Sequence, residues 1–227
     1  MTSTSLTPEV PYAPPPDDGL VPVWLDDALV VVDKPSGLLS VPGRGAERAD
    51  CMLSRADNRW PGVRVVHRLD MATSGLLVLA RTELAQRQLS ISFADRATDK
   101  RYVAVVHGLV EPDAGEIDLP LITDWPRRPL QKVCHEQGKP SLTRFEVLSR
   151  DPSTQQTRLA LMPVTGRSHQ LRVHLLAIGH PIVGDPLYGP DAFATQPASR
   201  LMLHAERLRM PHPDDGRAMD WHCPAPF

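Results

Sequence analysis

The sequence predicts an α+β fold with a mixed, largely antiparallel sheet. Short apolar runs rich in β-branched residues are distributed along the chain, and such runs are typical of strands when Pro, Gly or Ser follows them. Only two segments repeat apolar residues with the period of a helix. Interspersed strands with two helices indicate the α+β class.

Four segments are expected to form strands. Residues 28–33, Ala-Leu-Val-Val-Val-Asp, end at the Pro-Ser-Gly turn of residues 35–37. The apolar run of residues 75–80 is long enough for a buried strand and short for a helix. Residues 101–108 and 158–163 supply the further strands.

Two segments are expected to form helices. Within residues 83–95, apolar side chains recur every four positions, at Ala85, Leu89 and Phe93. Within residues 168–181, one face carries Leu171, Leu175 and Ile178. Ser168 stands where an N-cap belongs, Gly179 at the C′ position and Pro181 just beyond it, so this helix has both of its end signals.

The chain of 227 residues is expected to form one domain, residues 23–227. A flexible Pro-rich tail, residues 1–22, is expected to precede it. No apolar run reaches the ~18 residues typical of a membrane helix, and the N-terminus lacks a secretory signal, which predicts a cytoplasmic protein. The three cysteines are widely spaced and form no C-x-x-C pair, which argues against a disulfide framework and a structural zinc site.

The charge is unevenly distributed. The formal net charge is −2, but the first 27 residues contain five acids and neither Lys nor Arg. Between positions 127 and 172, nine basic residues stand against three acidic ones. A local excess of this kind suits a phosphate backbone, and it is equally compatible with Arg side chains scattered over solvated faces.

A first polar cluster lies directly before the apolar run of residues 75–80. His67, Arg68, Asp70 and Thr73 fall on the loop that feeds this expected strand. A carboxylate on such a loop is held firmly by the core behind it, so Asp70 is a candidate nucleophile or general base. The alternative is that Asp70 only makes a local turn or capping bond.

A second polar cluster covers residues 165–174, around the start of the second expected helix. It contains Arg167, His169, Gln170, Arg172 and His174. Helix N-termini bind anions readily, so these cations are expected to bind phosphates or to pair with a carboxylate elsewhere. The alternative is an amphipathic helix whose polar face is merely solvated.

Three other kinds of site are excluded by missing partners. The run His-Arg-Leu-Asp has no Gly-rich phosphate loop and no Asp-Phe-Gly, which a protein kinase needs. The His-Ala-Glu at 204–206 has no following Pro-Cys-x-x-Cys, which a zinc deaminase needs. His169 and His174 are five positions apart, off the i, i+4 spacing of two helical ligands, so no metal is expected.

Five segments together carry a resemblance to a known family. In order along the chain they are DKPSGLLSVPG (33–43), HRLDMATSGLLVLA (67–80), KRYVAVVHG (100–108), GRSHQLRVHLLAIGHPIVGDPLYG (166–189) and LMLHAERL (201–208). In this order they resemble the RluA family of pseudouridine synthases, over about residues 23 to 227. The intervening residues 118–141 are similar to the dual-specificity members, which modify 23S rRNA and the tRNA anticodon stem-loop.

The resemblance implies the pseudouridine synthase fold, with flanking helices and a central RNA-binding cleft. It implies isomerisation of uridine to its C-glycoside, with Asp70 as the essential residue. Arg172 is implied as the positive partner that orients this carboxylate. Tyr102 is implied as the active-site tyrosine that stacks on the target base and assists proton removal from C5. Without the resemblance, a single Tyr in a strand indicates only a core position.

The resemblance also implies how RNA is bound. The target uridine must leave its stack, and Arg68 is placed where a side chain can fill the vacated space. Phosphate contacts are implied for Arg127, Arg128, Lys132, Arg167 and His169. The implied partner is RNA, either 23S rRNA or tRNA or both, with no DNA, membrane, metal or cofactor, for a monomer without a separate S4 RNA-binding domain.

Two other functions are weighed against this one. A noncatalytic RNA-binding protein on the same fold is expected to have lost Asp70, Tyr102 or Arg172, and the sequence has all three. A glycosidase-like hydrolase needs a carboxylate pair, and the motifs offer no convincing second carboxylate for that role. Cofactor-independent isomerisation of RNA uridines is therefore the leading hypothesis.

Overall fold

The computed structural model describes residues 12–189 and 199–227. Its first half contains four strands and three helical segments. In chain order these are β1 (Pro22–Leu25), β2 (Leu29–Lys34), the 3-10 helix η1 (Ala46–Arg48), α1 (Met52–Arg59), β3 (Arg64–Val65), β4 (Ser74–Ala80) and α2 (Glu83–Ala94).

The second half of the described chain is mostly strand. In chain order it contains β5 (Asp99–His107), β6 (Ala114–Asp118), β7 (Leu121–Thr123), the 3-10 helix η2 (Trp125–Arg127), β8 (Gln131–Val133), β9 (Leu142–Asp151), β10 (Gln156–Pro163), α3 (Gln170–Ala177), β11 (Leu203–Pro211) and β12 (Ala218–His222).

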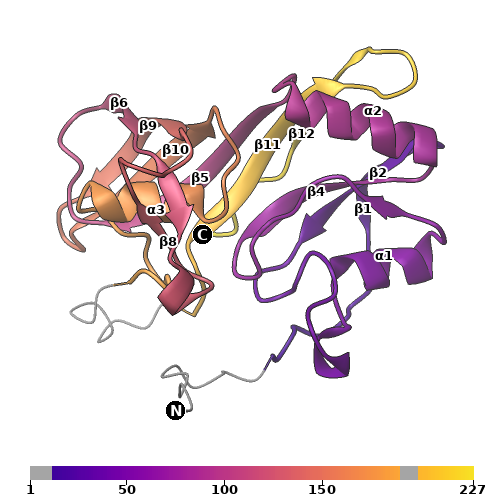
Figure 1. The fold of residues 1–227 in the computed structure, drawn as a ribbon, viewed down its shortest axis with the longest axis horizontal. Coiled ribbons are helices and arrows are strands. Elements are labelled where there is room, and N and C mark those ends of the chain that lie inside the picture. The colour runs from indigo at the N-terminus through magenta and orange to yellow at the C-terminus, as the bar shows by residue number, and fades with distance from the viewer. Residues whose placement is uncertain (1–11, 190–198) are drawn as a thin grey trace.

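One ten-stranded sheet runs through both halves (Figure 1). The strand order is β1-β2-β4-β11-β5-β10-β9-β6, with β3 paired to β4 and β12 to β11. The β4–β11 pair is parallel, and the other pairs of this sheet are antiparallel. The predicted mixed, largely antiparallel sheet is confirmed, and its expected strands agree closely with β2, β4, β5 and β10.

Helices α1 and α2 lie on opposite sides of β2 and β4 (Figure 1). Leu29 and Val31 of β2 pack in the apolar cluster that includes α2. Val30 and Val32 pack in the cluster that includes α1. Because successive strand residues point to opposite faces, a continuous apolar run lets β2 pack against both helices at once. Each such fully buried side chain contributes about 1.5–3 kcal/mol to stability.

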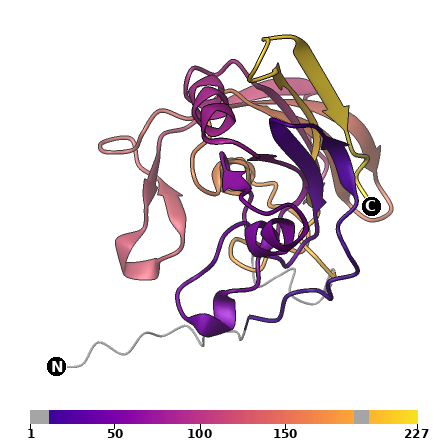
Figure 2. The ribbon, with the colours of Figure 1, turned by 90° about the vertical axis from the view of Figure 1, so that its right-hand side faces the viewer.

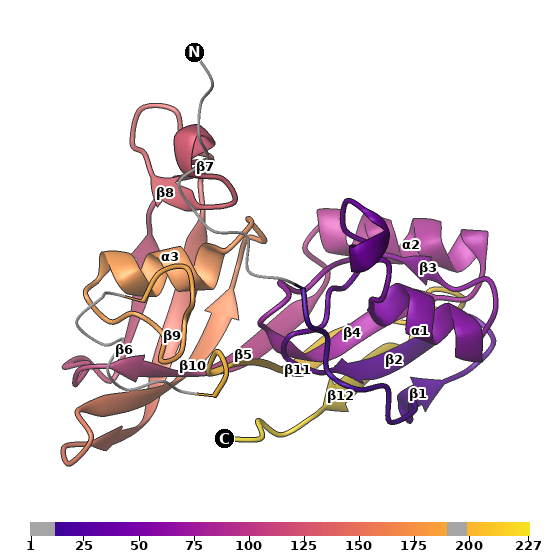
Figure 3. The ribbon, with the colours of Figure 1, turned by 90° about the horizontal axis from the view of Figure 1, so that it is seen from below.

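Helix α3 covers the other half of the sheet, beside β9 and β10 (Figure 3). Leu171 and Leu175 join Leu159 and Leu161 of β10 in a third apolar cluster. The small hairpin β7–β8 is separate from the large sheet and stands out from the body of the domain (Figure 2). Strands β11 and β5 therefore lie between the half of the sheet that packs against α1 and the half that packs against α3.

The predicted helix of residues 83–95 is confirmed as α2, but the second predicted helix begins later than expected. Its N-cap is His169, not Ser168, because His169 has a left-handed φ of 54° and only the residues after it are helical. Gln170 caps the turn by accepting a hydrogen bond from the Arg167 amide at 3.0 Å. Gly179 has the left-handed φ expected of a C′ glycine, and Ile178, expected on the buried face, is 36% exposed.

The sequence-based reading missed α1. Its N-cap is Cys51, whose sulfur accepts a hydrogen bond from the Ser54 amide, while the Ser54 hydroxyl bonds back to the Cys51 amide. A cysteine seldom serves in this role, so the residue pattern lacks the usual Ser, Thr, Asp or Asn signal. Met52 and Ala56 carry the buried face of this helix.

The described part of the predicted tail, residues 12–22, packs on the domain. The Tyr12 hydroxyl donates to the Asp50 carbonyl at 2.9 Å. Arg55 of α1 donates to the carbonyls of Pro15 and Pro16 at 2.6 and 3.2 Å. Proline carbonyls thus supply contacts that the composition did not suggest, and residues 1–11 lie outside the described part. No helix in the described part of the chain is long and apolar enough to cross a membrane.

Candidate active site

The loop that carries Asp70 lies between β3 and β4 and is fastened to residues 34–40. Side chains and amides of this segment bond to the loop backbone: the Lys34 ammonium and Gly37 amide to the Met71 carbonyl, the Ser36 hydroxyl to the Ala72 carbonyl, and the Ser40 hydroxyl to both the amide and the carbonyl of Leu69. The motif DKPSGLLS therefore acts as the support of the Asp70 loop.

Lys34 is the buried centre of this support. Its Nζ atom donates to the carbonyls of Pro35, Leu38 and Met71 at 2.8, 2.6 and 3.1 Å. Burial lowers the pKa of Lys34 to about 7, against the opposing effect of the Asp70 charge. Three carbonyl acceptors satisfy all three ammonium donors, so Lys34 holds the loop from within the core.

Arg172 links Asp70 to a second carboxylate. Its Nη1 atom donates to Oδ2 of Asp70 at 3.2 Å. Its Nε and Nη2 atoms donate to the two carboxylate oxygens of Asp185 at 2.8 and 2.6 Å. Burial disfavours the charge of Arg172, but Asp185 and Asp70 outweigh it and raise the pKa of the guanidinium. The predicted pairing of Asp70 with Arg172 is present, and Asp185 fixes the arginine in place.

His169 and Tyr188 form the next contacts of this network. The Nδ1 atom of His169 lies 2.7 Å from the Tyr188 hydroxyl, and its Nε2 atom lies 3.9 Å from Oδ2 of Asp70. The Tyr188 ring lies under the Arg172 guanidinium, 5.0 Å from its centroid. Burial lowers the pKa of His169, so the neutral imidazole is favoured. His169 thus borders the Asp70 carboxylate as a polar, uncharged group.

Six of the predicted site residues line one cavity of about 90 Å³. They are Asp70, Tyr102 and Arg172 with Arg68, Arg167 and His169. They come from the loop before β4, from β5 and from the start of α3, so the sheet brings together segments far apart in the sequence. Burial, and secondarily the Asp70 charge, raise the pKa of the Tyr102 phenol. The hydroxyl of Tyr102 is therefore neutral at physiological pH.

Arg68 and Arg167 are the exposed cations at this cavity. Within the described part of the chain, the one hydrogen bond of the Arg167 side chain runs to the Pro140 carbonyl, at 3.5 Å. Among residues 12–189 and 199–227, the guanidinium of Arg68 has neither a hydrogen bond nor an ion pair. Both cations therefore remain available to an anionic or aromatic ligand.

The other predicted RNA-binding residues lie on the hairpin β7–β8 and do not line the cavity. Arg127 donates to the buried Asp124 carboxylate at 2.7 Å, and the Lys132 ammonium lies 3.9 Å from it. Arg128 lies over the exposed Trp125 ring, 4.7 Å from its centroid. The hairpin is tied to the site because the Gln131 amide donates to the Tyr188 hydroxyl at 2.8 Å.

His67 is a structural residue. Its Nε2 atom accepts a hydrogen bond from the Val78 amide at 3.0 Å, and its ring stacks on Phe93 with centroids 4.5 Å apart. Burial, and then the Lys100 charge, lower the pKa of His67 to about 3. The first residue of the motif HRLD therefore anchors the loop to β4 and α2.

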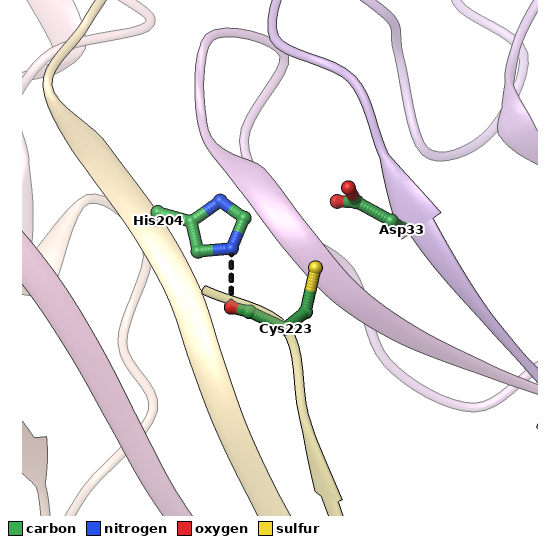
Figure 4. A group of neighbouring side chains, drawn as sticks. All are labelled: Asp33, His204 and Cys223. Carbon is green, nitrogen blue, oxygen red and sulfur yellow. Dashed lines mark hydrogen bonds between the residues drawn. The ribbon is translucent and has the colours of Figure 1, made fainter. Parts of the chain in front are cut away.

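One group in the described chain brings three potential metal ligands within 4.8 Å: Asp33, His204 and Cys223 (Figure 4). His204 Nε2 donates to the Cys223 carbonyl at 2.8 Å, so Nδ1 is left to accept from the Ser74 hydroxyl at 2.8 Å. Burial raises the pKa of the Cys223 thiol to about 12. Metal binding requires a free imidazole nitrogen, and both ring nitrogens of His204 are already engaged in hydrogen bonds.

Comparison with known proteins places the site in a family. The sequence model of the family described as RNA pseudouridylate synthase matches residues 28–177. Over 217 residues the chain is 51% identical to the dual-specificity RNA pseudouridine synthase RluA of Escherichia coli (strain K12), covering 95% of this chain and 98% of that protein. The chain belongs to the RluA family of RNA pseudouridine synthases. Members of this family are isomerases.

Further comparisons agree with this membership. The protein of the same name from Vibrio vulnificus (strain CMCP6) is 54% identical over 206 residues, covering 89% of this chain and 82% of that protein. The solved structure of human RNA Pseudouridylate Synthase Domain Containing 1 matches with a TM-score of 0.80 and 31% identity, over 95% of this chain and 87% of that one. The pseudouridine synthase fold predicted from the sequence is confirmed.

The sequence motifs implied no role for three residues that build the site: Lys34, Asp185 and Tyr188. Lys34 lies in the first family motif, and the other two lie in GDPLYG at the end of the fourth. Their presence inside quoted motifs was the available signal. Their roles depend on contacts across the fold, which spacing in the sequence does not reveal.

Proposed function

We propose that this protein isomerises specific uridines of structured RNA to pseudouridine, with Asp70 as the essential carboxylate. The observation that carries the proposal is the contact of 3.2 Å between Arg172 Nη1 and Asp70 Oδ2 at the wall of a cavity that Tyr102 also lines. RNA modification by this family supports the choice of reaction.

The reaction breaks the N1–C1′ bond, rotates the held base, joins C5 to C1′ and releases the C5 proton. Asp70 serves it as a nucleophile toward the sugar or base, or as the base that removes a ribose proton. Each route needs one carboxylate oxygen directed at the nucleotide. Oδ2 of Asp70 is bonded to Arg172, whereas Oδ1 accepts no hydrogen bond from any described residue and is left for the substrate.

Tyr102 is proposed to bind the flat face of the uracil. Its ring lies in the cavity beside Asp70, and aromatic stacking on a flipped base contributes about 1–3 kcal/mol. The raised pKa of its phenol means that the hydroxyl acts as a neutral hydrogen-bonding group. Proton removal from C5 therefore uses the hydroxyl as an acceptor or relay, with no phenolate at neutral pH.

Base flipping is proposed to deliver the uridine. A uridine in a folded RNA reaches a half-buried carboxylate only after it leaves the stack, at a cost of a few kcal/mol. The Arg68 guanidinium, which has no ion pair with a described residue, stands at the same cavity and is planar, so it can stack in the space that the uridine leaves. Arg167 is proposed to hold an adjacent phosphate.

The proposed substrates are 23S rRNA and the tRNA anticodon stem-loop, and the proposed setting is the cytoplasm, with a monomer as the active unit. The names of the relatives support two RNA substrates. On the hairpin β7–β8, Arg128 is the cation without a carboxylate partner among the described residues, so it is proposed as the main phosphate contact there.

Tritium release from RNA labelled at uracil C5 tests this function, because the new C5–C1′ bond expels that hydrogen. Wild-type protein is expected to release tritium from both 23S rRNA and tRNA transcripts. Asp70→Asn is expected to abolish release while RNA binding persists, and Asp18→Asn, at an exposed acid outside the cavity, serves as the matched control. Release by Asp70→Asn would refute the assignment, and release from one RNA alone would refute dual specificity.

A further inference from the structure

A second and larger cavity, of about 530 Å³, lies beside the active site. Its walls come from the turn after α2, the start of β5, β9, the end of β10 and the middle of β11. Pro163, at the end of β10, lines both this cavity and the one that contains Asp70. The two hollows are therefore neighbours on the same surface.

The second cavity is strongly basic. Six of its eleven lining residues are cations, and Asp99 is its one acid. The cations are Arg96, Lys100, Arg101, Arg144, Arg207 and Arg209. A concave surface lined by one sign of charge concentrates ligands of the opposite sign, so this hollow favours an anion.

Four of the six cations have carboxylate partners. Arg101 bonds to Glu206 at 2.8 Å. Arg144 bonds to Glu116 at 2.7 Å. Arg207 and Arg209 share Asp220, at 2.5 and 3.5 Å. One carboxylate for two arginines leaves part of their charge without a partner.

Lys100 and Arg96 are the cations without a carboxylate partner among the described residues. Arg96 is exposed, and Lys100 is half-buried. Arg96 and Lys100 line the same hollow, and burial, followed by the charge of Arg96, lowers the pKa of Lys100. Two adjacent cations held in a hollow are arranged to bind an anion between them.

Lys100 also connects this cavity to the catalytic one. It precedes Tyr102 by two positions on β5, and residues two apart on a strand point to the same face. A Cβ atom on Gly166 would stand 3.8 Å from the Lys100 ammonium, and Gly166 adjoins the phosphate-binding candidate Arg167. A cationic path thus runs from the active site into the second cavity.

We propose that this second cavity binds backbone phosphates of the RNA strand that flanks the target uridine; the proposal rests on the proposed function. A polymer that enters the active site continues past it, and the neighbouring hollow offers unneutralised cations along that route. Arg96, Lys100 and Arg209 carry this binding, since the remaining arginines are already paired more closely.

The salt dependence of RNA binding tests the proposal. Each phosphate contact contributes about 0.7–0.9 to the slope of log K against log salt concentration. Binding of anticodon stem-loop RNA is measured from 50 to 300 mM KCl, on the order of the range where such slopes are resolved, with Asp70→Asn in every arm so that the RNA stays unmodified. Arg96→Gln and Arg209→Gln are each compared with Arg87→Gln, at an exposed arginine of α2 outside the cavity.

Each cavity variant is expected to lower the slope by about 0.7–0.9, and Arg87→Gln is expected to leave it unchanged. With Asp70 restored, kcat/KM falls in the cavity variants while kcat at saturating RNA stays the same. Unchanged slopes in both cavity variants would overturn the proposal. A second result would also overturn the proposal. If inorganic phosphate competes with RNA for the wild-type protein but not for the variants, while the salt slopes of RNA binding stay unchanged, the cavity binds a free anion.

These outcomes are separable from the proposed function. Reduced slopes in a protein that releases no tritium would leave the phosphate cavity standing and refute the isomerase assignment. Tritium release with unchanged slopes would refute the cavity and leave the isomerase assignment standing.

Discussion

The Nη1 atom of Arg172 lies 3.2 Å from Oδ2 of Asp70, although the two residues are 102 positions apart in the chain. Asp70 comes from the loop before β4 and Arg172 from α3. The two-bond contact of Arg172 with the buried Asp185 sets the position of the guanidinium. The orientation of the proposed catalytic carboxylate therefore depends on a residue that does not line the cavity.

Asp185→Asn is expected to reduce both stability and turnover. Removing one charge of a buried pair typically costs about 3–5 kcal/mol, and displacement of a catalytic group by about 1 Å can cost roughly 10²-fold in rate. We expect urea unfolding to show a loss of this order, and tritium release to show a fall in kcat with little change in the dissociation constant of the RNA.

Glu83→Gln is the matched control for this change. Glu83 pairs with Arg64 outside both cavities, where the two side chains are exposed, and such surface pairs contribute about 0–1 kcal/mol. A kcat in Asp185→Asn equal to that of the control would contradict a positioning role for Asp185.

Gly75→Ala is expected to destabilise the junction of the two halves of the sheet. Gly75 has a φ of 111°, and a Cβ atom there would stand 2.4 Å from the Ala205 carbonyl oxygen of β11. Left-handed strain costs about 1–2 kcal/mol, and a forced backbone shift costs about 1–3 more. Urea unfolding should show the sum of both.

Gly62→Ala separates these two costs. Gly62 has a φ of 89° with no atom within 4 Å of an added Cβ, so only the strain of about 1–2 kcal/mol is expected. Equal losses of stability for the two variants would show that β11 tolerates the added methyl group, which would contradict the close approach of Gly75 to the Ala205 backbone.

Much of the fold follows from local pattern. The run of residues 75–80 is apolar because β4 is buried on both faces, and this run predicted the strand directly. Leu89 recurs four residues after Ala85 because both face the core, which predicted α2. The sequence pattern did not predict helix α1 because its N-cap is a cysteine, a residue without a strong capping signal.

The candidate site divides in the same way. Asp70 was a candidate because it lies on the loop before an apolar strand, and its pairing with Arg172 was implied by motifs whose order matches a family. Lys34 and Asp185 were not assigned, because a buried lysine with three carbonyl acceptors and a carboxylate that orients an arginine are defined by tertiary contacts alone. Ser168 was the predicted N-cap, but His169, whose backbone is left-handed, caps the helix instead.

His67 is expected to make the protein acid-sensitive above the range where carboxylates titrate. The pKa of His67 in the folded protein, about 3, lies below the usual 6.5, so the unfolded chain binds a proton in a pH range where the folded chain does not. The free energy of unfolding therefore falls as pH falls below 6.5, by about 1.4 kcal/mol per unit. Between pH 6.5 and 5 we expect a loss of ~2 kcal/mol from this group.

Urea unfolding of His67→Gln at both pH values measures this contribution. Glutamine does not titrate, so the variant should be less stable at pH 6.5 but lose less stability on acidification. His222→Gln, at an exposed histidine, is the control and should keep the wild-type pH dependence. A wild-type pH slope in His67→Gln would mean that other groups cause the acid sensitivity.

Arg68→Ala is expected to leave stability unchanged and to impair turnover on structured RNA. Its exposed guanidinium makes no hydrogen bond or ion pair with a described residue, so unfolding should shift by less than about 0.5 kcal/mol. If Arg68 fills the space of the flipped uridine, its loss restores an unstacking cost of about 1–3 kcal/mol, which corresponds to roughly 5- to 150-fold in kcat/KM. A linear RNA of the same sequence has little stacking to lose and should be affected far less.

Arg167→Ala serves as the comparison for Arg68→Ala, because Arg167 is also exposed at the cavity but is proposed to hold a phosphate. Its loss should lower kcat/KM on the stem-loop and the linear RNA by a similar factor, since both present the same backbone charge. The ratio of the two substrates therefore distinguishes a side chain that replaces a base from one that binds a phosphate. An equal loss on both RNAs in Arg68→Ala would place Arg68 among the phosphate contacts and leave base flipping without its proposed side chain.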